Sequence, residues 1–161
     1  MQENDVKAKG SRQLRKGRFS WVGPRYFITS FIAGEAENID SQLCFEVIIG
    51  ELAKLENEGA LFCEALVVMP DHIHMIVRLG GQEKIGQAMK LFKGRTAREI
   101  NRKRNATGAL WYEGYHDHLI RPDQPLAKFL GYISRNPVKR GLCKSPADWP
   151  YLLIKDEIQQ F

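Results

Sequence analysis

The four histidines of this 161-residue chain form two His-x-His pairs, His72 with His74 and His116 with His118. Residues i and i+2 of a strand point to the same face, so a strand over the first pair would place two imidazoles side by side. Two adjacent imidazoles can hold one divalent cation. The turn predicted at Pro70 puts this pair at a strand end, where binding sites commonly lie. The first pair therefore predicts a metal site that needs further oxygen or nitrogen ligands, and the alternative is two histidines that simply face solvent.

Tyr115 immediately precedes the second pair and is a candidate nucleophile. A tyrosine can attack a phosphodiester when a cation polarises the phosphate and the phenol loses its proton. If this segment is helical, Tyr115 and His118 share a face at i, i+3 spacing. If it is a strand, Tyr115 points with Asp117, and the histidines face the opposite side. The alternative role for Tyr115 is packing, which is the usual fate of a tyrosine.

Several other kinds of site are excluded by motifs that the sequence lacks. It has no HExxH, no P-loop and no GxGxxG, so neither a zincin site nor a nucleotide cofactor is expected. A histidine-triad hydrolase would need a third histidine where Ile76 stands. The three cysteines are far apart and form no CxxC, which excludes a disulfide scaffold or a thiolate zinc site and favours a reducing cytoplasm. No apolar run reaches the ~18 residues of a membrane helix.

Apolar periodicity and turn residues predict the elements that must position these groups. Strands are expected at 25–32, 60–69 and 72–79, and helices at 40–58, 84–104 and 125–135. Residues 111–121 fit either a strand or a helix, and the chain after residue 137 is expected to be irregular. The β-α-β-β-α order favours an α+β fold of the ferredoxin-like (split βαβ) type. Such a fold has an antiparallel sheet with helices packed mainly on one face, which leaves the other face or an edge for a ligand.

Polar and turn residues predict where these helices begin and end. Asp40 or Ser41 is expected to cap the first helix, and Gly59 is expected to end it in a left-handed conformation. Asp123 is expected to cap the last helix, and Asn136-Pro137 to stop it.

The net charge of +5, from 24 Lys and Arg against 19 Asp and Glu, is unevenly distributed. Residues 35–64 carry eight acidic side chains and one basic one, whereas residues 90–104 carry seven basic ones and one acidic one. A basic surface built from several segments is typical of nucleic-acid binders, although solvated faces show similar clusters. The candidate DNA-binding residues are Arg12, Arg15, Lys16, Arg18, Lys93, Arg95, Arg98, Arg102, Lys103 and Arg104.

The chain length and its patterning indicate one domain with an arm. A chain of this length supports one sizeable core and is too short for two. Residues 1–20 lack apolar periodicity and are interpreted as a flexible basic arm that could order on a nucleic acid. Arginines in this arm are suited to guanine edges. Residues 21–161 are interpreted as the single folded domain.

The sequence MPDHIHMIV at residues 69–77 resembles the His-hydrophobic-His motif of HUH-type, single-tyrosine transposases. The resemblance extends to RYFIT at 25–29, LFK at 91–93, WYEGYHDH at 111–118, YISRNPVKRGL at 132–142 and PADWP at 146–150. The order and spacing of these motifs are similar to those of REP-associated tyrosine transposases. This resemblance implies a metal-dependent endonuclease and strand transferase that acts on single-stranded DNA. It also implies a 5′-phosphotyrosine intermediate and recognition of hairpins with a short flanking tetranucleotide.

The resemblance also implies roles for individual residues. His72 and His74 carry over as metal ligands and catalytic residues, and Tyr115 carries over as the nucleophile. The family usually has a glutamine four positions after the tyrosine that completes the metal site, but Leu119 stands there. His118 is therefore taken as the substitute third ligand. The expected cofactor is Mg²⁺ or Mn²⁺, and imidazole ligands favour Mn²⁺ relative to a site made only of oxygens.

The expected partners are single-stranded DNA hairpins, without a membrane. A monomer is favoured, with a dimer that shares sites as the alternative. The expected location is the bacterial cytoplasm, with association to the nucleoid when DNA is bound. Two other functions stay open at this point. One is a non-catalytic, ferredoxin-like module that binds hairpin DNA or RNA, and the other is a metal-dependent phosphodiesterase acting on small nucleotides.

Overall fold

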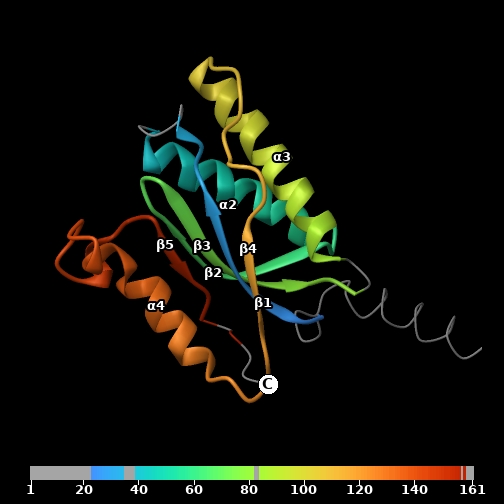
Figure 1. The fold of residues 1–161 in the computed structure, drawn as a ribbon, viewed down its shortest axis with the longest axis vertical. Coiled ribbons are helices and arrows are strands. Elements are labelled where there is room, and N and C mark those ends of the chain that lie inside the picture. The colour runs from blue at the N-terminus through green and yellow to red at the C-terminus, as the bar shows by residue number, and fades with distance from the viewer. Residues whose placement is uncertain (1–22, 35–38, 82–83, 157, 159–161) are drawn as a thin grey trace, which may run out of the picture.

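The computed structural model describes residues 23–34, 39–81, 84–156 and 158, so the predicted basic arm, residues 1–20, lies outside the described residues. At the centre is a five-stranded antiparallel sheet with the spatial order β4-β1-β3-β2-β5 (Figure 1). The strands are β1 (Arg25–Phe31), β2 (Leu61–Val68), β3 (His72–Leu79), β4 (His116–Ile120) and β5 (Leu152–Ile154). The first three confirm the predicted strands, and the α+β, ferredoxin-like class is confirmed as well.

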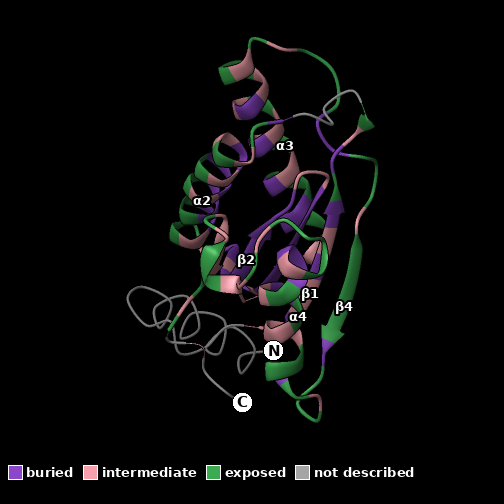
Figure 2. Ribbon diagram, turned by 90° about the vertical axis from the view of Figure 1, so that its left-hand side faces the viewer, coloured by how far each residue is buried: buried purple, intermediate pink, exposed green. Residues whose placement is uncertain are grey.

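Helices pack on both faces of the sheet. α2 (Ser41–Asn57) and α3 (Ile85–Arg104) cover one face, over a large apolar core that includes Ile48, Met75 and Phe92. α4 (Leu126–Lys139) packs on the other face, where Ile133 joins a second core with Val67. The face that was expected to be free is therefore partly covered, while the edge strand β4 is exposed along most of its length (Figure 2). No helix in the described ranges is long and apolar enough to cross a membrane.

The predicted boundaries of α2 and of the following hairpin are confirmed. Asp40 caps α2, because its carboxylate accepts a hydrogen bond of 2.9 Å from the backbone N–H of Gln42. Gly59 follows the helix with φ +72°, a left-handed conformation that glycine adopts without strain. β2 and β3 are joined by a tight turn in which the backbone N–H of Met69 donates to the carbonyl of His72 at 2.8 Å. This turn sets the first histidine of the pair at the start of β3.

The predicted start of α4 is confirmed within one residue, but its predicted cap and its predicted end are wrong. The residue before the helix is Pro125 rather than Asp123, and no side chain caps this end. The helix also continues through Asn136 and Pro137: the proline gives up one backbone hydrogen bond, but both residues are buried, and this packing keeps the last turn helical. The helix ends at Lys139, and Gly141, two residues later, has φ +71°. The residue after it, Leu142, donates its backbone N–H to the carbonyl of Pro137 at 3.0 Å, as in a Schellman motif.

The structure also resolves the ambiguous segment and corrects the C-terminal one. Residues 111–121 contain a strand, since Trp111 bridges Ile32 and β4 pairs with β1. The segment after residue 137 was expected to be irregular, but it contains two short regular elements. A 3₁₀ helix spans Pro146–Asp148, and β5 pairs with β2 at the far edge of the sheet. Three-residue elements carry too little periodicity to be found from a single sequence.

A substitution at Gly80 should destabilise the fold strongly. A Cβ atom there would lie 1.7 Å from the backbone carbonyl oxygen of Gly59, which cannot move without disturbing the end of α2. We expect Gly80→Ala to lower the free energy of unfolding by at least about 2 kcal/mol. Gly50, inside α2, has no atom within 4 Å of its Cβ position, so Gly50→Ala should raise stability by up to about 1 kcal/mol. Urea denaturation measures both, and a neutral Gly80→Ala would contradict this packing.

Candidate active site

His72 and His74 form a close pair on the sheet face that α4 covers. Both side chains are buried, with 6% and 5% of their surface exposed. Their Nε2 atoms lie 3.1 Å apart, and the ring centroids are separated by 4.6 Å. They sit on β3 opposite Phe31 and Thr29 of β1. The two imidazoles thus point to one place, as the i, i+2 spacing predicts.

Neighbouring side chains hold the outer nitrogens of both rings. Nδ1 of His72 donates to the Asp71 carboxylate at 2.7 Å, and Thr29 Oγ1 lies 2.8 Å from Nδ1 of His74. Arg140, just after α4, approaches the same carboxylate at 3.4 Å. Burial disfavours ionisation of Asp71, but its bonds to His72 and Arg140 hold its pKa below the usual value. With Nδ1 occupied in each ring, the two Nε2 atoms are left to accept a shared ligand.

Burial keeps His74 neutral. Burial, and to a smaller extent the nearby charge of His72, lower the pKa of His74 to about 4. A neutral imidazole has the lone pair that a metal ion needs, whereas a protonated one does not.

The tyrosine beside this pair is Tyr132 of α4. Its ring centroid is 5.2 Å from that of His74 and 5.7 Å from that of Phe27, and 42% of the residue is exposed. Lys139 Nζ lies 5.6 Å from the centre of the same ring. Tyr132 is therefore in contact with the histidine pair and open to a substrate at the same time.

Asn136 lies one helical turn after Tyr132, between that residue and Arg140. Tyr132, Asn136 and Arg140 are spaced i, i+4 and i+8, so they follow one face of α4. Tyr132 contacts His74, and Arg140 contacts Asp71. The helix face that carries Asn136 between them therefore points toward the histidine pair. Asn136 is buried, and its amide has no hydrogen-bond partner among the described residues. Its place between Tyr132 and Arg140 makes Asn136 a candidate ligand for an ion held by the histidine pair.

Tyr115 lies on the opposite face of the sheet, contrary to the prediction that it joins the histidines. β4 pairs His116 with Thr29, so His116 shares the face of the histidine pair and Tyr115 points the other way. Tyr115 packs against the core under α3, and a Cβ at Gly86 would lie 4.0 Å from its hydroxyl. Burial raises the pKa of Tyr115, and the charge of Asp117 raises it further. The Tyr115 phenol is partly buried on the face of the sheet away from the histidines, so this arrangement does not bring it to the pair.

His118 is also separated from the pair. It lies opposite Phe27 on β1, which stands between β4 and β3. Its ring stacks on Phe129 at 5.5 Å, and its Nε2 is 3.2 Å from Gln124 Oε1. The side chain of His118 is therefore engaged with α4 and its preceding turn rather than with His72 and His74. This arrangement does not bring His118 to the pair as a third ligand, and the described residues hold no group of three or more His, Cys, Asp or Glu suited to a metal.

The predicted DNA-binding residues of α3 lie on the side of the sheet away from the histidines, and several have other partners. Lys93 donates to the backbone carbonyl of Tyr112 at 2.7 Å. Arg95 forms a two-pronged ion pair with Glu58 at 2.8 and 2.9 Å, and Arg102 pairs with Glu99. The remaining three α3 candidates have no ion pair within the described ranges; they are Arg98, Lys103 and Arg104.

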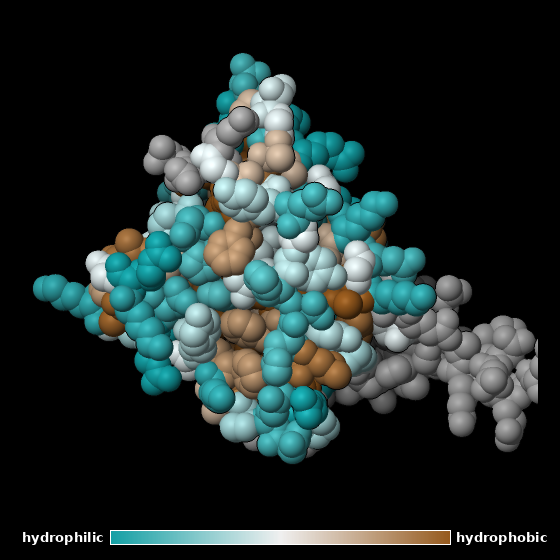
Figure 3. All heavy atoms as spheres, in the orientation of Figure 1, coloured by the Kyte–Doolittle hydropathy of each residue, from teal (hydrophilic) through white to brown (hydrophobic). Residues whose placement is uncertain are grey.

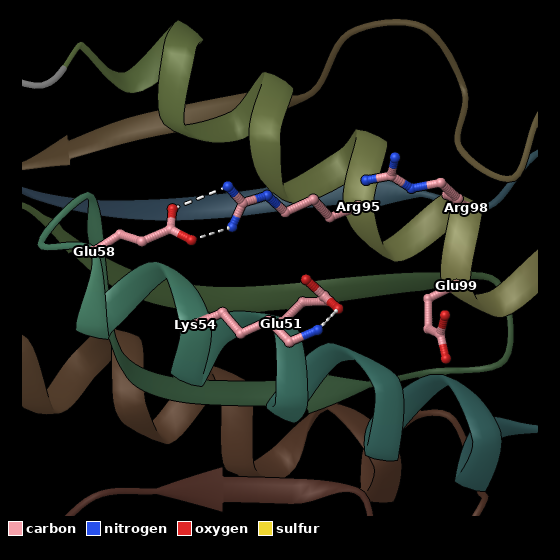
Figure 4. Close-up of a pocket in the computed structure, with 6 residues that line it drawn as sticks. All are labelled: Glu51, Lys54, Glu58, Arg95, Arg98 and Glu99. Carbon is pink, nitrogen blue, oxygen red and sulfur yellow. Dashed lines mark hydrogen bonds and ion pairs between the residues drawn. The ribbon is translucent and has the colours of Figure 1, made fainter.

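A surface pocket between α2 and α3 carries much of this basic charge together with acidic charge. Arg95 and Arg98 line it with Lys54, but so do three glutamates, Glu51, Glu58 and Glu99 (Figure 4). Because the charges balance, this pocket does not form a phosphate-binding cradle. The other four candidates, Arg12, Arg15, Lys16 and Arg18, lie outside the described residues.

Tyr132 and Asn136 were not predicted as site residues, although their spacing in the sequence indicates that they share a helix face. Tyr132 and Asn136 lie in the segment YISRNPVKRGL, with the tyrosine and a carboxamide four positions apart. This is the spacing expected for a tyrosine and an amide ligand on one helix. The assumed helix end at Asn136-Pro137 hid it, because it placed the amide outside the helix.

Comparisons with known proteins give matches in sequence and in fold. Residues 40–136 match the family model described as "Transposase IS200 like". A Haemophilus influenzae protein assigned as a REP-associated tyrosine transposase is 33% identical over 97 residues, which is 54% of this chain and only 55% of that protein. The REP-associated tyrosine transposase of Escherichia coli is 27% identical over 79% of this chain and 78% of its own length.

Two solved structures have a similar fold. The structure of a REP-associated tyrosine transposase bound to a REP hairpin has a TM-score of 0.65 at 24% identity, covering 84% of this chain and 79% of that one. A Deinococcus radiodurans protein assigned as a transposase has a TM-score of 0.52 at 21% identity, covering 73% and 93%. At these identities the similarity concerns the fold.

Proposed function

This chain belongs to the IS200-like transposase family, and from that premise we propose that it cleaves and rejoins single-stranded DNA at hairpins through a phosphotyrosine on Tyr132. The observation that carries the proposal is the contact between Tyr132 and the paired histidines His72 and His74. The hairpin in a structural neighbour and the REP-associated relatives support a REP-type hairpin as the substrate.

The residues beside Tyr132 fit a divalent cation. His72 and His74 offer converging Nε2 atoms, and Asn136 offers an amide oxygen on the facing helix. These three residues would hold Mg²⁺ or Mn²⁺, whose chemistry there is to withdraw charge from a phosphate oxygen. Two nitrogen ligands favour Mn²⁺, since Mg²⁺ prefers an all-oxygen shell.

Tyr132 supplies the nucleophile in this scheme. Its phenolic oxygen forms a bond to phosphorus while the bond from phosphorus to the 3′ oxygen breaks, and that oxygen takes up a proton. The phenol proton passes to solvent. The resulting phosphotyrosine retains the energy of the broken bond, so that a second 3′-hydroxyl can reverse the step. No nucleotide is consumed, in agreement with the missing P-loop.

Covalent capture tests this proposal. The protein, Mn²⁺ and an oligonucleotide with a hairpin and unpaired flanks should give a protein–DNA adduct that survives denaturing electrophoresis. A chelator should prevent it. Tight binding of the hairpin without cleavage or adduct would instead support a non-catalytic binding module, and turnover of small nucleotides would support a phosphodiesterase.

Asp71 should matter for cation affinity, because it orients the His72 ring through Nδ1. We expect Asp71→Asn to weaken Mn²⁺ binding by roughly 10- to 100-fold, the range for such supporting carboxylates. Arg140→Gln should have a smaller effect, since Arg140 is half-exposed and 3.4 Å from Asp71. Asp117→Asn is the matched control, because Asp117 is opposite Ile28 and so faces the other side of the sheet. Calorimetric titration with Mn²⁺ measures all three, and unchanged affinity in Asp71→Asn would contradict the assigned role.

A further inference from the structure

Exposed aromatic side chains gather around the histidine pair. Among the described residues, the large aromatic side chains that are strongly exposed are Phe31 at 40%, Tyr112 at 55% and Tyr132 at 42%. Tyr132 is the proposed nucleophile, which leaves Phe31 and Tyr112 without an assigned role. Isolated exposed aromatics need no explanation, but a group of them beside a reactive centre does.

Phe31 connects the histidine pair to the open edge of the sheet. Its ring centroid is 5.6 Å from that of His72 and 6.1 Å from that of His116, with the second contact edge-to-face. His116 is exposed and stands at the start of β4, on the same sheet face as the pair. The rings of Phe31 and His116 thus continue from the buried histidine pair to the exposed edge strand β4, on a part of the sheet that α4 does not cover. On the side of the molecule seen in Figure 3, apolar residues lie along the middle between hydrophilic surfaces.

The backbone around these rings is held in place by several contacts. The N–H of Tyr112 donates to the carbonyl of Phe31 at 3.0 Å, so the two residues are adjacent. The neighbouring residue Trp111 is buried and donates its indole N–H to Thr96 of α3 at 3.0 Å. Lys93 fixes the following loop through the Tyr112 carbonyl. A surface that keeps its aromatic rings exposed on a fixed backbone is preorganised for a flat ligand.

We propose that Phe31, Tyr112 and His116 form a stacking platform for unpaired DNA bases next to the scissile phosphate. The inference rests on the proposed function, because it places the bases relative to Tyr132. Any of the four nucleobases can stack on an aromatic ring. The nearby Lys139 and Arg140 supply positive charge for the phosphates of the DNA strand. The platform binds the single-stranded flank and leaves the paired stem to other surfaces. An apolar peptide would use the exposed rings but would gain nothing from this charge.

Binding measured in a chelator separates this platform from the cleavage reaction. Fluorescence anisotropy should compare a blunt DNA hairpin with the same hairpin carrying an unpaired extension on its 5′ or its 3′ side. We expect Phe31→Leu to weaken binding of an extended hairpin about ten-fold and to leave the blunt hairpin unchanged. Phe31→Trp should restore tight binding, because it restores the aromatic face. His116→Ala should give a smaller loss in the same direction.

An abasic extension and a control variant complete the test. Wild-type protein with an abasic extension should bind as weakly as Phe31→Leu with the normal one, and combining both changes should add little. Leu91→Ala is the control, since Leu91 is 40% exposed on α3, behind the sheet. Equal losses on both hairpins, no loss in Phe31→Leu, or no binding of extended hairpins by the wild type would overturn the platform. These binding measurements are made in a chelator, which blocks cleavage. Their outcome is therefore independent of whether the covalent adduct forms, so the platform and the proposed function can each be disproved without the other.

Discussion

Replacing Tyr132 with phenylalanine is expected to abolish the covalent adduct and strand cleavage, with a loss of at least about a thousand-fold. The change removes the attacking oxygen and keeps the ring contacts with His74 and Phe27 at 5.2 and 5.7 Å, so the fold should not change. Denaturing electrophoresis of the protein with labelled hairpin DNA measures the adduct, and anisotropy measures binding. Hairpin binding should stay within about three-fold of wild type, because no paired base depends on this hydroxyl.

Tyr115→Phe is the matched control for this experiment. The Tyr115 hydroxyl lies near Gly86, behind the sheet, and its loss removes no group from the histidine side. We expect the adduct to form at close to the wild-type rate in this variant. If the adduct is lost in Tyr115→Phe and persists in Tyr132→Phe, the nucleophile is Tyr115 and the assignment of Tyr132 is wrong.

Removal of either histidine of the pair is the second large effect that we expect. His72→Ala and His74→Ala each take away an Nε2 atom at the point where the two rings converge. Charge stabilisation by a bound cation is worth several kcal/mol, so the cleavage rate should fall on the order of a thousand-fold. Cleavage of labelled hairpin DNA at saturating Mn²⁺ gives this rate. Asn136→Ala should also lower it, and Asn136→Asp, which keeps an oxygen in place, should recover much of the loss at high Mn²⁺.

His118→Ala is the corresponding control, because His118 stacks on Phe129 and lies two strands from His74. It should cleave near the wild-type rate. A loss in His118→Ala as large as that in His74→Ala would mean that β4 supplies a ligand after all. Thermal melting of each variant distinguishes lost chemistry from lost folding, which matters for the buried His74.

The parts of the site that could be predicted are those set by local spacing. His72 and His74 are two positions apart on a strand with strong β signals, so their shared face followed directly from strand geometry. The family and the sheet were also predicted correctly, because motifs in order along a chain carry more information than any one of them.

The parts that could not be predicted depend on packing between distant segments. The identity of the third group near the histidines depends on how α4 crosses the sheet, which no local pattern specifies. The segment holding Tyr115 was ambiguous between helix and strand, and its strand form already turns Tyr115 away from the histidines. Likewise, the basic residues of α3 gave a strong charge signal, but Arg95 is paired with Glu58 of another helix. A charge count along the chain cannot include a partner that only the fold brings close.

The position of the phosphotyrosine is the central claim, and mass spectrometry of the adduct after nuclease and trypsin digestion tests it most directly. Trypsin separates the two candidates, because Tyr132 falls in the peptide 129–135 and Tyr115 in the peptide 105–128, where Pro122 blocks cleavage after Arg121. We predict that the nucleotide mass is found on the peptide 129–135, at Tyr132. Its presence on Tyr115, or cleavage of the hairpin without any modified peptide, would contradict the account.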